Sequence, residues 1–434
     1  MVREEWGSRL GFLLAGVGSA VGLGNVWRFS YIVGQNGGGA FLVPYLVSII
    51  AFGLPLMMLE FSVGRHFKGS VVSCMRKIKD SFRWVGVVIV AVNTVVLSYY
   101  LVITGWTVAF LSLTLLRSEM DFNSFSQTYY TPLFFIIVAF ITAFVVMRGV
   151  KSGIEKTSKI MIPSLGILLM GMVVYALTLP NAVDGILFYF KPDLSMFNDY
   201  SMWSAAFGQA FFSLSVGSGI LLTYGSYLDD KESLVSNSVI ITFFDLMISI
   251  VSAVIVFSIV FSFSLEPAAG PNLAFSTLPH VFSSVPYGMV LAAVFYLLLF
   301  FAALTSSISM FEVTTAAFID EARLSRAKSS MILLAILLVL GLPSALSYSG
   351  MSLQLDGIPV LDHVDQLFGS VAILFTALLI SVSVTWFFDN RIIKNQINKN
   401  ARWNVGNSVF VLVKYIIPIA LFYVLAARIF NLVI

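Results

Sequence analysis

Small and polar residues interrupt the first long apolar segment of the chain. Residues 16–28 read GVGSAVGLGNVWR, with four glycines, and with Asn25 and Arg28 near the end. Backbone that leaves a helix at membrane depth finds no water, so it persists only where it is buried in protein or lines a cavity. The peptide groups freed at such a break can hold ions or a polar ligand. The segment therefore indicates a substrate-binding site in a transporter.

Glycines at this spacing have two other common interpretations. Gly18 and Gly22 form a GxxxG pair, which allows two helices to pack closely. Close packing explains the small residues, but it explains neither Asn25 beside Gly24 nor Arg28. A dinucleotide-binding fingerprint does not fit, because no strand and no acidic ribose partner accompany the glycines.

A second glycine interruption lies in the sixth apolar segment, where Gly-Ser-Gly occupies residues 217–219 and follows Gln209 and several serines. Two interrupted spans that lie five spans apart predict a 5+5 inverted repeat with broken helices 1 and 6. The expected organisation is a single transporter domain over residues 1–434, with repeat one at about 8–180, repeat two at about 201–390 and an extra helix at about 408–433.

The composition predicts an all-α polytopic membrane protein. Hydrophobic residues make up 59% of the chain and charged residues 11%, whereas soluble domains average about 25% charged residues. The mean hydropathy is +0.95. Eleven segments are apolar and long enough to cross about 30 Å of hydrocarbon. They lie near residues 10–32, 41–63, 85–115, 132–147, 160–179, 203–222, 239–263, 289–311, 331–346, 369–388 and 409–433.

The basic residues predict the orientation of these eleven spans. Of the 25 Lys and Arg residues, only Arg117 and Lys191 fall in predicted outer loops, and Arg28, Lys414 and Arg428 fall within spans. The remainder lie in segments that are inside if the N-terminus is cytoplasmic, which is the positive-inside pattern. We therefore expect a multi-pass plasma-membrane protein with its C-terminus outside, and a net charge of +3 that reflects topology rather than a nucleic-acid partner.

No enzymatic centre is indicated by the sequence. Cys74 is the only cysteine, and the three histidines lie in different loops. A cysteine-based metal cluster and an internal disulfide are therefore not expected. No nucleophile–base pair is recognisable, so the chain is not predicted to be an enzyme.

Seven motifs resemble the neurotransmitter:sodium symporter family, which includes a bacterial leucine transporter. They occur in the family's order between residue 3 and about residue 390. They are WGSRLG at 6–11, GLGNVWRF at 22–29, NGGGAF at 36–41, YY at 99–100, GQAFFSLS at 208–215, LTSS at 304–307 and LDHVD at 361–365. The resemblance implies a sodium-coupled secondary active symporter that imports an amino acid by alternating access.

The resemblance also implies a substrate site. The amides at Leu23 and Gly24 and the Tyr100 hydroxyl would face the substrate carboxylate, aided by the helix dipole. The carbonyls of Ala20 and Phe212 and the side chain of Ser215 would take the ammonium group, with Ser213 shared with a sodium site. Amine-carrying relatives have Asp where this chain has Gly22, which favours amino acids. The substrate side chain would contact Val96, Ile103, Phe212, Ser218, Ser306 and Met310. Ser218 stands where the bacterial leucine transporter has a bulky aromatic residue, so the pocket would have room for a larger side chain. We therefore expect a hydrophobic or aromatic amino acid.

Two sodium ions are implied by the family. Site one would comprise Ala20, Asn25, Ser213, Asp245 and the substrate carboxylate, and site two would comprise Gly18, Val21, Ala302, Thr305 and Ser306. Hydroxyl residues within a helix often bond back to their own backbone. Taken alone, the run Thr305-Ser306-Ser307 favours that alternative. Together with the other motifs of the family, it favours the sodium site.

Asp245 departs from the family's usual Asn. A lone carboxylate at mid-span costs about 2.5–3.5 kcal/mol on insertion scales, so it needs a cation. In chloride-dependent relatives a bound anion supplies a negative charge near this position. In this chain the corresponding anion ligands would be Ser249, Tyr45, Gln209 and Ser213. Because Asp245 already supplies that charge, we predict that transport does not require chloride. Glu60 and Glu312 are further acids within spans; they share a proton or are satisfied by backbone.

Charged pairs are expected to close the site at both ends. The resemblance implies that Arg28 and Asp365 form the outer gate, and that Arg3 and Asp320, with Trp6 and Tyr227, form the inner gate. Two alternatives remain: an amino-acid-binding membrane sensor that does not transport, and a symporter of a small osmolyte. The expected partners are the amino-acid substrate and the lipid bilayer, without nucleic acid, and the oligomeric state is left open.

Overall fold

The computed structural model describes residues 3–118, 120–192, 194–265, 274–275, 278–283 and 285–433, and these residues are predominantly helical. The first half contains α1 (Arg9–Ala20), η1 (Gly24–Arg28), α2 (Phe29–Gln35), η2 (Gly38–Phe41), α3 (Leu42–Val47), η3 (Ser48–Gly53), α4 (Leu54–Phe67), α5 (Val71–Ile78), η4 (Asp80–Phe82), α6 (Arg83–Leu115), α7 (Phe122–Ser126), α8 (Tyr130–Met147), η5 (Val150–Glu155), α9 (Lys156–Ala176), α10 (Ala182–Phe190) and η6 (Leu194–Asn198). The second half contains α11 (Tyr200–Ser213), α12 (Ile220–Gly225), α13 (Leu234–Ser262), α14 (Leu278–Ser283), α15 (Gly288–Ala322), α16 (Arg326–Ser347), α17 (Val360–Val364), η8 (Asp365–Ala372), α18 (Ile373–Phe387), α19 (Asn390–Asn398), α20 (Asn407–Val411), η9 (Leu412–Ile416) and α21 (Ile417–Val433). An antiparallel hairpin of β1 (Gln354–Leu355) and β2 (Ile358–Pro359) pairs Gln354 with Pro359.

Among the described residues, nine continuous helical runs are long and apolar enough to cross a membrane. They are Gly38–Phe67, Asp80–Leu115, Tyr130–Met147, Val150–Ala176, Leu234–Ser262, Gly288–Ala322, Arg326–Ser347, Val360–Phe387 and Asn407–Phe430. The pair Arg9–Ala20 and Gly24–Gln35, bent by 65°, makes a tenth. The predicted sixth span corresponds to α11 and α12, which are individually too short, so the count of eleven stays a prediction.

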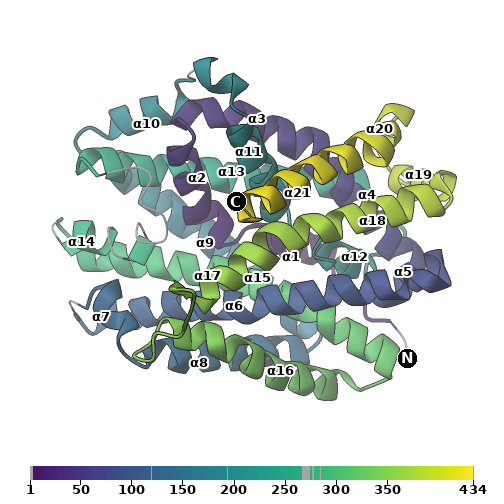
Figure 1. The fold of residues 1–434 in the computed structure, drawn as a ribbon, viewed down its shortest axis with the longest axis horizontal. Coiled ribbons are helices and arrows are strands. Elements are labelled where there is room, and N and C mark those ends of the chain that lie inside the picture. The colour runs from purple at the N-terminus through teal and green to yellow at the C-terminus, as the bar shows by residue number, and fades with distance from the viewer. Residues whose placement is uncertain are drawn as a thin grey trace.

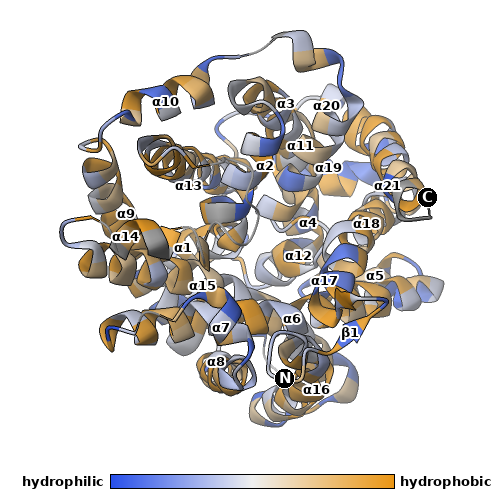
Figure 2. Cartoon of the chain, turned by 60° about the vertical axis from the view of Figure 1, so that its left-hand side comes forward, coloured by the Kyte–Doolittle hydropathy of each residue, from blue (hydrophilic) through white to orange (hydrophobic). Residues whose placement is uncertain are grey.

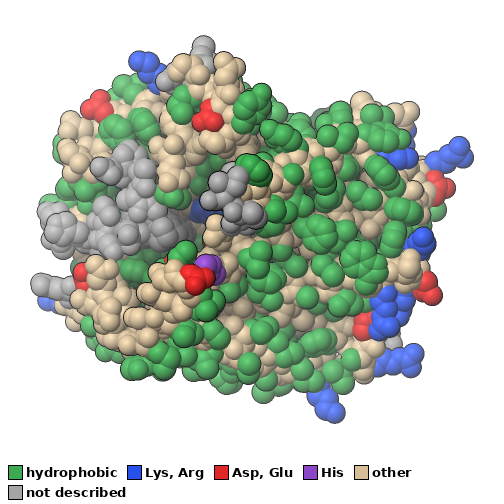
Figure 3. All heavy atoms as spheres, in the orientation of Figure 1, with side chains coloured by type: hydrophobic (Ala, Val, Ile, Leu, Met, Phe, Trp, Pro, Cys, Tyr) green, Lys and Arg blue, Asp and Glu red, His purple; other side chains and the backbone are tan. Residues whose placement is uncertain are grey.

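The helices form a bundle with chemically different ends and sides. Figure 1 shows the N-terminus, α5, α19 and α20 at one end of the long axis, and α7, α10 and α14 at the other. Most Lys and Arg side chains visible in Figure 3 gather at the first end, which we call the basic end, beside a broad hydrophobic surface. Hydrophobic residues also cover the peripheral helices in Figure 2. This distribution is that of a protein surrounded by lipid.

Both predicted helix breaks are present. The first helix ends at Ala20, the backbone of Val21 is extended, and π-helical geometry begins at Gly24. The second break, residues 214–219, separates α11 from α12 and begins before the predicted Gly-Ser-Gly. Its turn needs left-handed backbone at Gly217 (φ +86°) and Gly219 (φ +80°), which glycine adopts readily. Ser215 also has φ +55°, at a cost of about 1–2 kcal/mol for a non-glycine residue.

The two breaks lie close together in the bundle. The helix α1 packs against α12, α13 and α15, and η1 packs against α11 and α13. Figure 2 shows α2, α4, α11 and α12 toward the middle of the bundle, whereas α8, α16 and α21 lie at its periphery. The fold therefore brings the interrupted backbone of both helices to one interior region.

Candidate functional site

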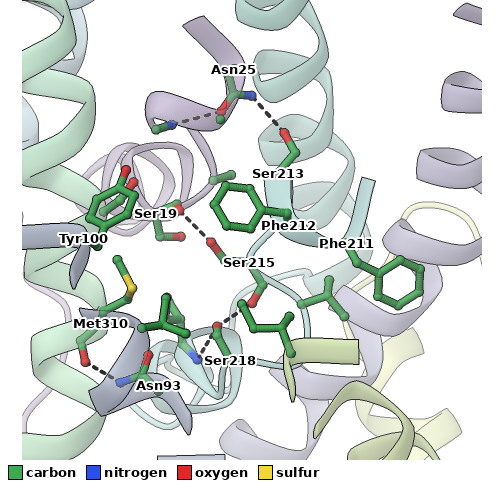
Figure 4. A pocket seen from close by; sticks show the side chains of 18 of the residues that line it. Ser19, Asn25, Asn93, Tyr100, Phe211, Phe212, Ser213, Ser215, Ser218 and Met310 are labelled. Carbon is green, nitrogen blue, oxygen red and sulfur yellow. Dashed lines mark hydrogen bonds between the residues drawn. The ribbon is translucent and has the colours of Figure 1, made fainter. Parts of the chain in front are cut away.

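A cavity of about 50 Å³ lies between the two breaks (Figure 4). Ten residues predicted to bind substrate line it: Ala20, Gly24, Val96, Tyr100, Phe212, Ser213, Ser215, Ser218, Ser306 and Met310. Leu23 and Ile103 do not line it. The other lining residues are Ser19, Gly22, Asn25, Val92, Asn93, Phe211, Val216, Ile220 and Ile373. The cavity is thus mainly apolar, with its polar groups concentrated at the helix breaks.

The first break meets α6 and α15 at one side of this cavity. The backbone N–H of Leu23 donates to the Tyr100 hydroxyl at 3.2 Å. A Cβ atom at Gly22 would lie 2.9 Å from both the Tyr100 hydroxyl oxygen and Ser306 Oγ. Any side chain at position 22 would therefore occupy the space where these two hydroxyls converge.

The second break supplies the opposite side of the cavity. Ser215 Oγ donates to the carbonyl of Ser19 at 2.7 Å, and this bond joins the two breaks directly. The Phe212 ring lies between the breaks, because a Cβ atom at Gly24 would be 2.8 Å from it and the Arg28 guanidinium stacks 4.4 Å from its centroid. Phe212 therefore covers the cavity beneath Arg28.

Asn93 is a buried polar residue of this cavity that sequence reasoning missed. Its Nδ2 donates to the carbonyl of Met310 at 2.8 Å, whereas its Oδ1 has no hydrogen-bond partner among the described residues. The orientation of the amide follows from these bonds. A single amide in the apolar run of α6 was the available signal. Asn93 Oδ1 can accept a hydrogen bond from a ligand.

The side chains predicted for sodium site one form a buried polar cluster. Asn25 Nδ2 donates to Ser213 Oγ at 2.9 Å, to Asp245 Oδ1 at 2.6 Å and to Ser249 Oγ at 2.8 Å. Ser213 also donates to Asp245 Oδ1, at 2.8 Å, while Asp245 Oδ2 has no partner among the described residues. The Tyr45 hydroxyl reaches Ser213 at 3.5 Å. A fully buried carboxylate with an unpartnered oxygen is costly unless a cation or proton neutralises it, so this oxygen-rich set suits a hard cation.

The residues predicted for sodium site two also converge. Ser306 Oγ donates to the carbonyl of Gly18 in α1 at 3.3 Å and to the carbonyl of Val21, in the break after α1, at 3.2 Å. Thr305 Oγ1 instead donates to its own helix, including the Ala302 carbonyl at 3.1 Å. The alternative interpretation therefore holds for Thr305 but not for Ser306. Three carbonyls and two hydroxyls meet here between α1 and α15.

The predicted inner gate is closed by direct contacts. Arg3 Nη1 donates to both carboxylate oxygens of Asp320, at 2.9 and 2.8 Å, and the guanidinium stacks 4.8 Å from the centroid of the Tyr227 ring. Trp6 Nε1 donates to the Tyr224 carbonyl at 3.1 Å. Ser70 adds its backbone N–H to Asp320 at 2.6 Å. The N-terminal segment is thereby fastened across the basic end of the cavity.

Arg28 and Asp365, the predicted outer pair, are not paired with each other. Among the described residues, no ion pair within 4.0 Å joins them: Arg28 stacks on Phe212, and Asp365 accepts a hydrogen bond from Tyr99 at 2.7 Å. Arg428 of α21 also reaches this region, where a Cβ atom at Gly208 would be 2.1 Å from its Nη2. No role was predicted for Arg428, because its position depends on how the last helix packs against the bundle. The residues predicted for the inner gate are therefore in direct contact, whereas the two residues predicted for the outer gate each contact another residue.

The two acids left open by the sequence have different partners. Glu312 binds Arg326 through two bonds, at 2.7 and 2.9 Å, and accepts the Tyr227 hydroxyl at 2.5 Å. Glu60 accepts the backbone N–H of Gly217 at 2.7 Å, inside the second break, and its Oε2 has no partner among the described residues. Glu312 thus belongs to the basic-end network, whereas Glu60 braces the break.

Comparisons with known proteins find similar proteins over almost the whole chain. The model of the sodium:neurotransmitter symporter family matches residues 3–134 and 129–433. A sodium-dependent transporter of Methanocaldococcus jannaschii is 35% identical, covering 94% of this chain and 86% of its own length. Another, YhdH of Bacillus subtilis, is 33% identical and covers 96% of both chains. A crystal structure of MhsT in complex with L-phenylalanine superposes with a TM-score of 0.89 at 34% identity, over 98% of this chain and 100% of the other.

Proposed function

Because the chain belongs to the sodium:neurotransmitter symporter family, we propose that it imports a hydrophobic or aromatic amino acid together with sodium by alternating access. The observation that carries this proposal is the buried oxygen cluster beside the cavity, in which Asp245 Oδ2 has no partner among the described residues. Sodium would neutralise this carboxylate and bridge it to the substrate carboxylate. Each ligand would then bind more tightly in the presence of the other, which is the reciprocity that coupling requires.

Sodium supplies the energy for accumulation in this proposal. Two ions moving through about 100 mV release about 4.6 kcal/mol, at about 2.3 kcal/mol per charge. Since 1.4 kcal/mol corresponds to a factor of ten, this supports about a thousandfold accumulation before any sodium concentration gradient is counted. The proposed stoichiometry of two is what the family implies, and the clusters at Asp245 and Ser306 are the candidate sites.

The substrate class is proposed from the lining and from a relative. MhsT was crystallised with L-phenylalanine, and the cavity here is lined by apolar residues including Val96, Met310 and Ile373. At about 50 Å³ it is smaller than the cavity of about 150 Å³ that holds benzene in an engineered protein. An aromatic substrate would therefore enter with movement of Met310, whose unbranched side chain adapts easily, and of Phe212.

We also propose the placement of the chain in the membrane. The basic end would face the cytoplasm, in agreement with the positive-inside rule, and α21 would carry the C-terminus toward the outside of the plasma membrane. Residues of about 8–180 and 201–390 would be the two inverted halves that move relative to each other around the breaks. Opening of the inner gate would then release substrate and sodium inward.

Uptake into proteoliposomes tests the proposal against its alternatives. With purified protein, an inward sodium gradient is expected to drive accumulation of labelled L-phenylalanine or L-leucine, and an equal potassium gradient is not. A sensor would bind these amino acids without accumulating them. A symporter of a small osmolyte would accumulate a compound such as betaine instead; either result would reject the proposed function.

Ser306 and Ser307 offer a matched pair of substitutions. Ser306→Ala removes a hydroxyl that faces the Gly18 and Val21 carbonyls across the helix interface, so the half-saturating sodium concentration is expected to rise about tenfold. Ser307→Ala removes a hydroxyl that donates to the Ala303 carbonyl of its own helix and lies 3.4 Å from the Thr104 hydroxyl, away from α1. It is expected to change the half-saturating sodium concentration less than threefold. Sodium-dependent uptake measures both values. Equal effects would remove Ser306 from the sodium site.

Asn93 is expected to influence which substrate is preferred. The unpartnered Asn93 Oδ1 favours a side chain that carries a donor, such as the indole N–H of tryptophan, over one that does not. Asn93→Leu is therefore expected to lower the affinity for tryptophan about tenfold relative to phenylalanine. Competition against labelled phenylalanine measures the ratio. An unchanged ratio would show that this oxygen does not contact the substrate.

A further inference from the structure

A second and larger cavity opens near the basic end, on the outside of the bundle. Its volume is about 390 Å³, within the range of about 300–1,000 Å³ that is usual for small-molecule sites. Its walls come from α5, α6, α15 and α16, and they include Val72, Ala91, Val95, Phe318 and Leu333. Val87 and Leu340 are 51% and 44% exposed. The cavity is therefore a groove that a membrane component can enter from the side, separate from the site between the helix breaks.

The groove has the dimensions of one membrane leaflet. The lining residues of α6 extend from Arg83 to Val95, which at 1.5 Å per residue is about 18 Å along the helix. The hydrocarbon core is about 30 Å thick, so this length covers about half of it. Thr94 and Thr314, whose hydroxyls are 2.7 Å apart, lie at the end of the groove that is farthest from the basic end. The groove thus runs from the basic end to mid-membrane depth.

Two arginines stand at the mouth of the groove and share one acid. Arg76 Nη1 and Arg83 Nη2 each lie 3.3 Å from Glu321 Oε2. The arginine side chains are 42% and 60% exposed, whereas Glu321 is 15% exposed. These three side chains together carry one net positive charge, and both guanidinium groups are accessible from outside the groove. Arginine presents these donors in a geometry that matches phosphate oxygens.

We propose that this groove binds an anionic phospholipid, with one acyl chain along α6, α15 and α16 and the phosphate on Arg83 and Arg76. The acyl chain gains no hydrophobic free energy over its place in the bilayer, because lipid tails are as apolar as the groove. The preference must therefore come from the head group. Basic pockets between membrane helices on the cytoplasmic side bind such head groups.

The bound lipid would also lie next to residues that adjoin the inner gate and the substrate cavity. Glu321 follows Asp320, the partner of Arg3, and Val72 lies two residues after Ser70, which donates to Asp320. At the other end of the groove, Thr314 Oγ1 lies 3.5 Å from Asn93 Nδ2, and Asn93 lines the substrate cavity. An occupied groove would brace α5 against α15 and so favour the closed inner gate.

Native mass spectrometry of the purified, delipidated full chain tests the proposal. The probes are dioleoylphosphatidylglycerol and dioleoylphosphatidylcholine, added at equal concentration. One tightly retained phosphatidylglycerol is expected, with at least tenfold preference over phosphatidylcholine. Arg83→Gln is expected to lower its retention about fivefold by removing one head-group contact, and Ala91→Trp is expected to abolish it by filling the groove.

Matched substitutions outside the groove serve as controls. Arg391→Gln removes an exposed arginine at the same end, and Ala335→Trp enlarges an exposed alanine of α16 that does not line the groove. Both are expected to retain the lipid as the unaltered protein does. Equal retention of the two lipids would overturn the proposal, as would loss of phosphatidylglycerol from the controls to the same degree as from the groove variants. Because the readout is lipid retention, it is independent of whether the protein transports an amino acid.

Discussion

Replacing Asp245 with Asn is expected to lower the affinity for sodium by a factor on the order of 100 or more. The carboxylate is fully buried, and Asn25 and Ser213 already satisfy its Oδ1, so Oδ2 remains for a cation. Removing one partner of a buried charge pair costs about 3–5 kcal/mol, and 1.4 kcal/mol corresponds to a factor of ten. The half-saturating sodium concentration for uptake, or for substrate binding, measures the loss.

The same residue predicts how the protein responds to chloride. Because Asp245 supplies a fixed negative charge, uptake by the unaltered protein is expected to be the same when gluconate replaces chloride. In Asp245→Asn an anion would have to supply that charge, so the remaining activity is expected to be higher in chloride than in gluconate.

Ser249→Ala is the control for Asp245→Asn, because it removes only a neutral hydroxyl that accepts from Asn25 and donates to the Asp245 carbonyl. A neutral hydrogen bond contributes about 0.5–1.5 kcal/mol, so the half-saturating sodium concentration is expected to change at most about tenfold.

The chloride prediction has its own contradicting result. If uptake by the unaltered protein collapses in gluconate, Asp245 does not serve as the fixed charge of the site.

Replacing Arg3 with Ala is expected to open the inner gate and expose Cys74. Arg3 binds both oxygens of Asp320, Ser226 and the face of Tyr227, and alanine would lose all of these contacts. Cys74 is fully buried in α5, and burial raises the pKa of its thiol to about 12. In the closed state it should therefore react very slowly with N-ethylmaleimide at neutral pH. In Arg3→Ala the rate of labelling is expected to rise at least tenfold.

The direction of this change separates gate opening from a local electrostatic effect. The positive charge of Arg3 lowers the pKa of the Cys74 thiol, so its loss without opening would slow the labelling. Arg9→Ala is the matched control, since Arg9 also lies near the N-terminus but binds Glu232 and Asn237 outside the gate. Because Cys74 is the only cysteine, the mass of the intact chain reports the labelling directly. Unchanged or slower labelling of Arg3→Ala would contradict the assignment of the gate.

The sequence predicts the parts of the site that follow from local chemistry. Glycines in an apolar span mark a backbone break, and Asn25 or Asp245 in such a span needs a polar partner, so the breaks and the cluster were both foreseeable. The start of the second break was not, because Ser215 adopts a left-handed conformation that its side chain disfavours. Tertiary contacts, among them its bond to the Ser19 carbonyl, hold it there.

The parts that could not be predicted depend on packing between distant segments. Ser306 and Ser307 are chemically identical, and only the position of α1 decides that the first bonds across the interface while the second bonds to its own helix. Arg28 and Asp365 carry opposite charges, yet Phe212 and Tyr99 are their observed partners. Arg428 reaches the same region from a helix expected only to be an addition to the repeats. Sequence spacing contains none of this information.

In the proposed mechanism, sodium and the amino acid bind next to each other between the two broken helices. Calorimetric titration of the purified protein with L-phenylalanine or L-leucine, in sodium chloride and in potassium chloride of equal ionic strength, tests it most directly. We predict binding at least a hundredfold tighter in sodium, and loss of this difference in Asp245→Asn. Equal affinity in the two salts would contradict the account.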